Sequence, residues 1–574
     1  MKKMLIGGLA TLLTISACTD AVKDHHADSV YVSAVIYTAN ESDPWSSAVA
    51  IKGDKIVYVG DDAAAYIGPE TMVYDLGDKL VIPGMIDAHT HPALVALGVG
   101  QFVLDESYTK EALMTAIRKT VAERPDEEVL IGGFWLNEIF DVTGPRKEDL
   151  DAIEPDRPLI IFDDWAHTVW ANSVALEQGG VTRDTKDIVP GFSFYQKDLS
   201  GEPTGWIVES AASVFINKFW SVSPAMEEST LEFLTYLRNL GVTTVFDAGN
   251  FGLDEEVYAA LSRLDKEGRL PIRYHGVYTL FLPDDYGGAI DELKRLGHTY
   301  NTDNLRIDTL KVFFDGVLET RTAALSSDYL DTPGNSGEGL LSREQLHQLV
   351  LDLDTEGLNL HVHSVGDRAV ATVLDAVQDA HESLRRAPRI RIAITHLEKV
   401  KETDFSRFKE LGVIAQLTPQ WVSGGDLSWY EAGIGDAAFE MQRMQTFIDK
   451  GAVVTFSSDI YSPDEWPADR ANPFLGMQVG HNRQEIGADP ESEALPPIED
   501  RIHRDELVNG YTTNAAYQLG RENELGRIAV GYRADLVVLN QNLFEVDRYE
   551  IHKTKPIAVI MNGEIVYGEL LQRR

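Results

Sequence analysis

The segment Pro83-Gly84-Met85-Ile86-Asp87-Ala88-His89-Thr90-His91 decides how the rest of the chain is interpreted. It continues the apolar run 80–86 and ends in two histidines with one residue between them. Side chains two residues apart on a strand point to the same face, so His89 and His91 are aimed together, as the ligands of a metal ion must be. Alone the motif is weak, because paired surface histidines can have the same spacing.

Downstream of this segment, strand-like apolar runs alternate with amphipathic, helix-length stretches. Repeated strand-then-helix units predict a parallel sheet, and their number favours a (β/α)8 barrel over a doubly wound sheet. Residues 98–226 interrupt this rhythm and hold many of the tryptophans, so we expect an insertion that caps the barrel. The predicted strands are 242–247, 306–314, 358–363, 391–396, 413–417 and 453–458, with helices such as 343–356 and 369–380 between them.

Both ends of the chain predict short strands instead. Alternating apolar residues at 30–37 are followed by a hairpin signal, Gly53-Asp54, and Asn562-Gly563 marks a second hairpin near the other end. We therefore expect a small composite β-sandwich domain built from residues 30–83 and 523–574. These two segments flank, in the sequence, a barrel that spans 84–522.

Four further residues have the chemistry of metal ligands. Lys311 lies in the apolar run 310–314, where burial lowers the pKa of the amine; the neutral amine can react with carbon dioxide to form a carbamate that bridges two ions. His363 and His396 each end a predicted strand and Asp459 follows one, so all three lie at carboxyl ends of strands, where barrel enzymes place their reacting groups. The alternatives are histidines packed in the core and a lysine paired with a carboxylate.

His361 lies on the same strand and face as His363, one layer deeper. We interpret it as a packed, hydrogen-bonded residue that supports the site; the alternative is that it is the ligand in place of His363.

The N-terminus predicts export. Two lysines precede the apolar run 4–15, which is too short to span a bilayer stably. The run ends in Ile15-Ser16-Ala17-Cys18, which resembles the lipobox of bacterial lipoproteins. The resemblance implies a signal peptide at 1–17, a lipid on Cys18, a tether at 18–29 and, since Thr19 follows the cysteine, an outer membrane location facing the periplasm.

The charge and the cysteine content argue against several other classes of protein. The formal net charge of -40 argues against nucleic-acid binding, because polyanions are bound by clustered lysine and arginine. A solvated acidic surface accounts for the charge. Cys18 is the only cysteine, which excludes an internal disulfide and a cysteine-rich zinc site.

The motif at 83–91 strongly resembles the first barrel strand of the amidohydrolase superfamily. KVFFDGVLETRTAAL around Lys311, HSVGDRA around His363 and SSD at Asp459 resemble the branch typified by N-substituted formamide deformylase. Segments 514–516, 525–528 and 531–539 are similar to its C-terminal hallmark, and DDWAHTVWAN and GEPTGWIVE to its insertion. The branch often has glutamate just before the histidine of the sixth strand, where this chain has Thr395.

This resemblance implies a role for each candidate. His89 and His91 would hold one metal ion and His363 and His396 a second, with Lys311 as the bridging carbamate. Asp459 would bind the first ion and the shared water and act as general base, and His167 would face the substrate. Two zinc ions suit this donor set, although other divalent ions also fit.

The expected function is metal-dependent hydrolysis of a non-peptide C–N bond in a small amide-like substrate, by an enzyme held to a membrane through its lipid. Alternatives are a mononuclear deaminase, a hydrolase of cyclic amides or dipeptides, and a non-catalytic surface lipoprotein; monomer and homodimer both stay open. The tryptophans either line a pocket for a bulky group or pack the cap: Trp135, Trp165, Trp170, Trp206, Trp421 and Trp429.

Overall fold

The computed structural model describes residues 26–99, 101–104, 107–220, 222–422, 426–462 and 469–572. The predicted signal peptide, Cys18 and most of the tether lie outside these residues. Among the described residues, no helix combines the length and the apolar character needed to cross a membrane.

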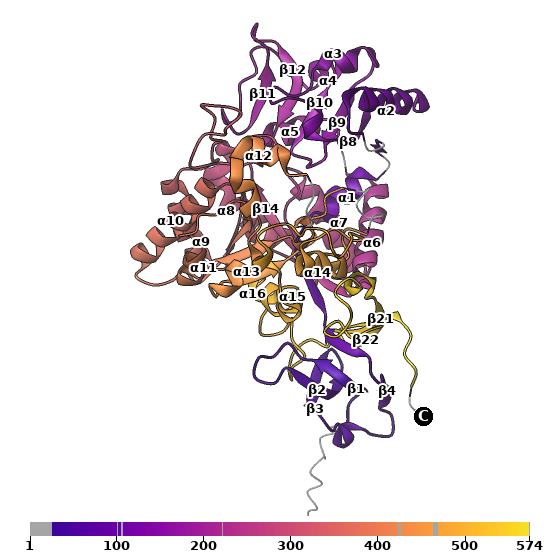
Figure 1. Cartoon of the computed structure of the whole chain (residues 1–574). Helices are drawn as coiled ribbons and strands as arrows, with labels where there is room; N and C mark the ends of the chain where they lie inside the picture. Colours follow the sequence, from indigo (N-terminus) through magenta and orange to yellow (C-terminus); the bar gives the residue numbers. More distant parts are fainter. Residues whose placement is uncertain are drawn as a thin grey trace, which may run out of the picture.

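The centre of the molecule is a barrel of eight parallel strands, as predicted (Figure 1). The last strand lies beside the first, and their ends are joined by backbone hydrogen bonds from Asp459 N–H to the His89 carbonyl (2.9 Å) and from His91 N–H to the Ile460 carbonyl (2.9 Å). The strands are β6 (Met85–Thr90), β13 (Val242–Asp247), β14 (Arg273–Leu280), β15 (Leu305–Phe313), β16 (Asn359–Ser364), β17 (Ile392–His396), β18 (Ile414–Leu417) and β19 (Val453–Phe456).

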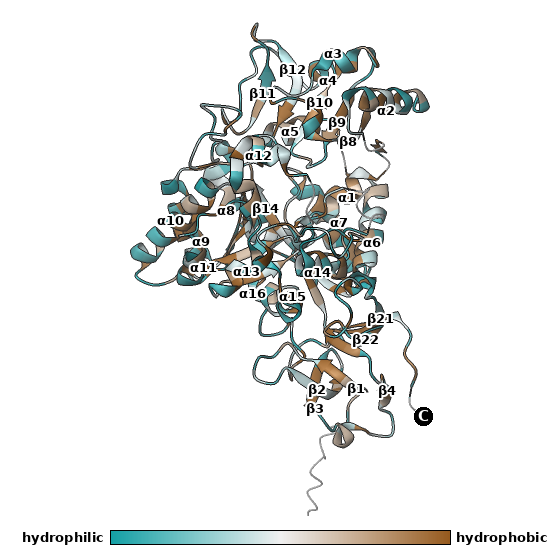
Figure 2. Cartoon of the chain, viewed as in Figure 1, coloured by the Kyte–Doolittle hydropathy of each residue, from teal (hydrophilic) through white to brown (hydrophobic). Residues whose placement is uncertain are grey.

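Amphipathic helices cover the outside of the barrel. In α10 (Asp367–Leu384) the buried residues recur every three or four positions, which places one apolar stripe against the strands. Helix α9 (Arg343–Glu356) begins with a capping box between Ser342 and Gln345. Figure 2 shows teal, hydrophilic residues along outer helices such as α10. The others are α6 (Pro224–Asn239), α7 (Asp254–Lys266), α8 (Ala289–Tyr300), α11 (Phe405–Leu411), α12 (Ser428–Ile434), α13 (Met444–Asp449), α14 (Pro473–Asn482), α15 (Arg504–Gly510) and α16 (Thr513–Gln518).

The two ends of the chain form one continuous eight-stranded sheet at the foot of the molecule in Figure 1. Strand β5 pairs antiparallel with β20, and Pro83 lies opposite Leu536, so the segments before and after the barrel share backbone hydrogen bonds. The strands are β1 (Ser29–Tyr37), β2 (Trp45–Lys52), β3 (Lys55–Gly60), β4 (Met72–Asp75), β5 (Leu80–Pro83), β20 (Leu536–Leu539), β21 (Pro556–Met561) and β22 (Glu564–Gly568).

The segment between β6 and α6 builds a second sheet at the other end of the barrel (Figure 1). It has six strands, and its core is rich in aromatic side chains. Its elements are α1 (Pro92–Gly98), β7 (Phe102–Val103), α2 (Lys110–Glu123), β8 (Leu130–Trp135), α3 (Lys147–Asp151), β9 (Leu159–Asp163), β10 (Thr168–Ala171), α4 (Ser173–Gln178), β11 (Phe194–Lys197), β12 (Pro203–Val208) and α5 (Ser210–Ile216).

Candidate metal centre

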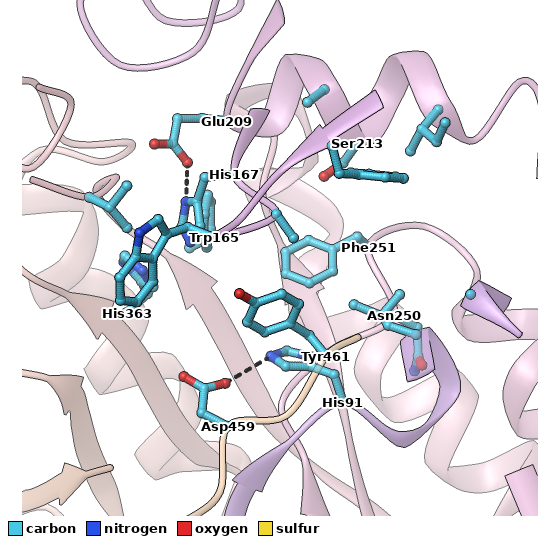
Figure 3. Close-up of a pocket in the computed structure, with 18 of the residues that line it drawn as sticks. His91, Trp165, His167, Glu209, Ser213, Asn250, Phe251, His363, Asp459 and Tyr461 are labelled. Atoms are coloured by element: carbon cyan, nitrogen blue, oxygen red, sulfur yellow. Dashed lines mark hydrogen bonds and ion pairs between the residues drawn. The ribbon is translucent and has the colours of Figure 1, made fainter. Parts of the chain in front are cut away.

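One cavity lies between the carboxyl ends of the barrel strands and the inserted sheet. Every candidate site residue that the structure describes lines it: His89, His91, His167, Lys311, His363, His396 and Asp459. Figure 3 shows several of these side chains pointing into the same space. Residues that are far apart in the sequence therefore meet at the end of the barrel where such enzymes carry out their chemistry.

The two histidines of the opening motif converge on Asp459. The Nε2 atoms of His89 and His91 lie 3.5 Å and 3.6 Å from the same carboxylate oxygen of Asp459. The Nδ1 atoms point away: that of His91 is 3.1 Å from the carbonyl oxygen of Gly249, and that of His89 is 2.9 Å from Nε2 of His361. Each ring thus keeps its Nε2 lone pair directed at the cavity, as a metal ligand requires.

His396 and His363 supply two more nitrogen donors. His396 Nδ1 lies 3.5 Å from the second oxygen of Asp459, is buried, and has no hydrogen-bond partner among the described residues. Such an atom fits a metal ion, because buried polar atoms otherwise find a partner. The His363 ring centroid is 4.5 Å from that of His396, and its Nδ1 is 3.3 Å from Asp315. His89, His396 and Asp459 form a buried group that could hold a metal ion.

Backbone geometry sets the position of Asp459. The residue lies three positions after the end of β19 and has a positive φ of 48°, which few L-residues adopt. Ser458 anchors the preceding turn: its hydroxyl donates to Asp87 at 2.5 Å and its N–H donates to the other oxygen of Asp87 at 3.0 Å. Burial raises the pKa of the Asp459 carboxyl to about 7, against the opposing effect of Lys311.

Lys311 is buried near the carboxyl end of β15, with 1% of its surface exposed. Burial lowers the pKa of its amine to about 7, although Asp459 and Asp247 act in the opposite direction. A substantial fraction of the amine is then neutral near pH 7, which is the form that reacts with carbon dioxide.

His167 enters the cavity from the inserted sheet. Its Nδ1 lies 2.6 Å from the carboxylate of Glu209, and its ring centroid is 5.7 Å from that of His363 (Figure 3). Thr322 donates to the other oxygen of Glu209 at 2.5 Å. Burial alone would lower the pKa of His167, but the charge and hydrogen bond of Glu209 raise it to about 9, so the imidazole is a cation at neutral pH.

Three positioning residues were missed by the sequence analysis. Asp87 holds Ser458, Asp315 holds His363, and Glu209 holds His167. All three lie inside segments already noted: the opening motif, GEPTGWIVE and KVFFDGVLETRTAAL. Their partners are distant in sequence, so no local spacing indicated the contacts.

Thr395 and His361 both support His89. The Thr395 oxygen is 3.1 Å from His89 Nδ1, and its hydroxyl donates to Gln416. The position at which the formamide deformylase branch often has glutamate therefore contacts the histidine of the first strand.

Some of the six tryptophans line the cavity, and others pack in the core of the inserted sheet. Trp165 and Trp421 line the cavity, and Trp421 stacks on His396 with centroids 5.5 Å apart and planes at 10°. Trp429 lies on the guanidinium of Arg321 at 4.6 Å. The remaining three pack in the core of the inserted sheet: Trp135, Trp170 and Trp206.

A parallel barrel with buried histidines and a carboxylate at its carboxyl end defines the class of metal-dependent hydrolases. Residues 72–567 match the amidohydrolase family, and the chain belongs to this family. It is 31% identical over 427 residues to the exoenzymes regulatory protein AepA of Pectobacterium carotovorum, covering 72% of this chain and 90% of that protein. It is 25% identical to the N-substituted formamide deformylase of Arthrobacter pascens, covering 94% of this chain and 98% of that enzyme.

Solved structures show the same fold. An uncharacterized metal-dependent hydrolase from Pyrococcus horikoshii OT3 aligns with a TM-score of 0.66 at 23% identity, covering 91% of this chain and 99% of that one.

Proposed function

We propose that this hydrolase cleaves a C–N bond outside peptides, of the amide or N-substituted formamide kind. The observation that carries the proposal is the convergence of His89, His91 and His396 on the two oxygens of Asp459, with Lys311 buried in the same cavity. The similarity to a formamide deformylase over 94% of the chain supports this bond type.

The donor set fits two divalent ions. His89, His91 and Asp459 would hold one ion and His363 and His396 the other, with Lys311 as a carbamate between them; zinc suits these ligands. Ions bound there lower the pKa of a coordinated water and polarise a carbonyl oxygen.

Asp459 and His167 would carry out the proton transfers and stabilise the charge that develops on the carbonyl oxygen. The Asp459 carboxylate accepts the proton of the attacking water as the C–O bond forms, and returns it to the nitrogen as the C–N bond breaks. His167, held as a cation by Glu209, donates a hydrogen bond to the carbonyl oxygen, on which negative charge develops.

Cys18 places the reaction at the cell envelope in this proposal, since the lipobox-like sequence implies a lipid anchor. Separation of membranes from soluble extract checks the location.

Metal stoichiometry tests the proposed function. The full-length protein, produced with zinc and bicarbonate, is analysed for metal and assayed on a panel of N-formyl amines and other amides, beside Lys311→Ala. We expect about two zinc ions per chain and hydrolysis of the panel in the wild type, with zinc and turnover reduced in the variant. Lys266→Ala, which removes an exposed lysine of α7, is the matched control.

The alternatives give different results. A single ion that is indifferent to Lys311→Ala points to a mononuclear deaminase, which belongs to the same superfamily as the resemblance implies. No bound metal and no turnover would favour the non-catalytic surface lipoprotein.

A further inference from the structure

Three carboxylates line the cavity among the described residues, and two of them have evident partners. Asp459 faces three histidines, and Glu209 binds His167 and Thr322. The third, Glu398, is left without a role in the mechanism proposed above.

Glu398 is buried, with 5% of its surface exposed, and contributes to the cavity wall. Its Oε2 atom has no hydrogen-bond partner among the described residues. The chain reaches this position through two residues of positive φ, His396 at 74° and Leu397 at 56°, and the Glu398 carbonyl accepts a hydrogen bond from Gln442 N–H at 3.1 Å. A fixed backbone thus holds a carboxyl group with one oxygen, Oε2, that has no partner in the described part of the chain. Since a buried polar atom without a partner is costly, a ligand in the cavity is the natural donor.

Two more carboxyl groups act on Glu398, and we call the three the acidic patch: Asp315, Glu319 and Glu398. Glu319 and Asp315 are close enough for their charges to disfavour a negative charge on Glu398. Glu319 accepts a hydrogen bond from the Tyr430 hydroxyl, but its Oε2 is also buried without a partner among the described residues. A cation beside the patch would relieve this repulsion, and the net charge of -40 attracts cations toward the protein.

Another part of the same cavity wall is apolar. Phe134, Phe162 and Trp220 all line it; Phe162 stacks on Trp220 with centroids 5.5 Å apart, and Phe134 lies 6.3 Å from Phe162. Ile216 and Phe251 line the cavity as well. Aromatic rings arranged in this way favour an aromatic or other bulky apolar group of a ligand.

We propose that the substrate carries both groups, an aromatic ring for the apolar wall and an alkylammonium that donates to Glu398, on a molecule that contains the scissile amide. The inference rests on the proposed function and narrows its substrate class to cationic aromatic amides. Glu398 is then a specificity-determining residue and takes no part in the bond-breaking step.

A matched pair of compounds tests the inference. N-[4-(aminomethyl)benzyl]formamide carries an ammonium where N-(4-ethylbenzyl)formamide carries a methyl group of similar size. We measure kcat/KM for both with the zinc-loaded full-length enzyme, Glu398→Gln and Glu398→Asp. Glu344→Gln, which removes the same charge from an exposed position of α9, is the control.

We expect the wild type to favour the ammonium compound by about ten- to a hundred-fold, the range of a hydrogen bond to a charged group. The preference disappears in Glu398→Gln through KM, is partly kept in Glu398→Asp, and is unchanged in Glu344→Gln. Equal kcat/KM values for the two compounds in the wild type, or an unchanged preference in Glu398→Gln, overturn the inference. The ratio of the kcat/KM values of the two compounds with the wild-type enzyme tests the inference even if a variant does not fold.

A binding measurement separates this inference from the proposed function. Calorimetric affinities of both compounds are compared in zinc-loaded Asp459→Asn and in Asp459→Asn combined with Glu398→Gln. If the wild type hydrolyses neither compound, the proposed bond type is wrong for them, and the ratio of affinities still decides: a preference for the ammonium that depends on Glu398 supports the inference, and equal or absent binding overturns it.

Discussion

Strands β6 and β16 carry the same pattern, two histidines separated by one residue, yet use it differently. Both strands have six residues, and His89 and His363 each occupy the fifth position. The other histidine of the first pair, His91, lies just beyond β6 and faces the cavity. The other histidine of the second pair, His361, precedes His363, lies deeper and contacts His89. The spacing gives two histidines a common face, and the position of the strand end decides which of them reaches the cavity.

The contact between His361 and His89 also ties together two strands that are not neighbours in the sheet. His361 lies beside Lys311 in the pairing of β15 with β16, so one buried layer holds both the lysine and the residue that contacts His89. Buried histidines of this kind commonly orient a metal-binding ring through its second nitrogen.

The largest effect is expected from Asp459→Asn, which removes the group on which both β6 histidines converge. The asparagine keeps the shape but cannot take up the proton, so kcat should fall by about 10²–10⁴-fold while zinc content is largely kept. Steady-state kinetics and elemental analysis on the same sample measure both quantities. An undiminished kcat would remove Asp459 from its proposed role as general base.

His361→Asn separates the deeper histidine from the ligands. We expect zinc affinity to fall by about 10–100-fold and turnover to recover in excess zinc, because the ring orients His89 without binding the ion. His91→Ala is the comparison, and its activity should not recover in excess zinc. Zinc titration monitored by activity distinguishes the two, and identical behaviour of both variants would make His361 a ligand as well.

Thr395→Val should have the smallest effect. Its oxygen shares His89 Nδ1 with His361, so the remaining contact continues to orient the ring. We expect a change in zinc affinity of no more than about tenfold, the lower limit for such supporting residues. A double variant with His361→Asn should lose more affinity than the two single changes together, measured in the same titration. Strict additivity would show that the two residues act independently.

The sequence predicted the barrel because its strands are short apolar runs that end in chemically unusual residues. Strand β14 escaped notice, because in RYHGVYTL the arginine, histidine and glycine interrupt the apolar pattern. The six-stranded sheet of the insertion was also unpredicted, since its strands alternate with loops of irregular length.

At the site, the ligand candidates were visible because each one ends or follows a strand. The residues that hold them were not, since the contact between Asp87 and Ser458 spans 371 positions. Glu398 gave no local signal either: only the fold shows that its Oε2 atom lacks a partner among the residues that the structure describes. Tryptophans such as Trp165 and Trp135 have similar sequence surroundings, and tertiary packing alone sends one to the cavity and the other to a core.

The pairing of β5 with β20 means that the sheet cannot be completed until almost the whole chain has been synthesised. When β5 leaves the ribosome, its partner strand is about 450 residues away, which corresponds to roughly 20 to 90 s of translation. During that interval one edge of β5 is an open template for pairing with other chains. Truncation anywhere before β20 makes the interval permanent, so shortened products of this chain should aggregate.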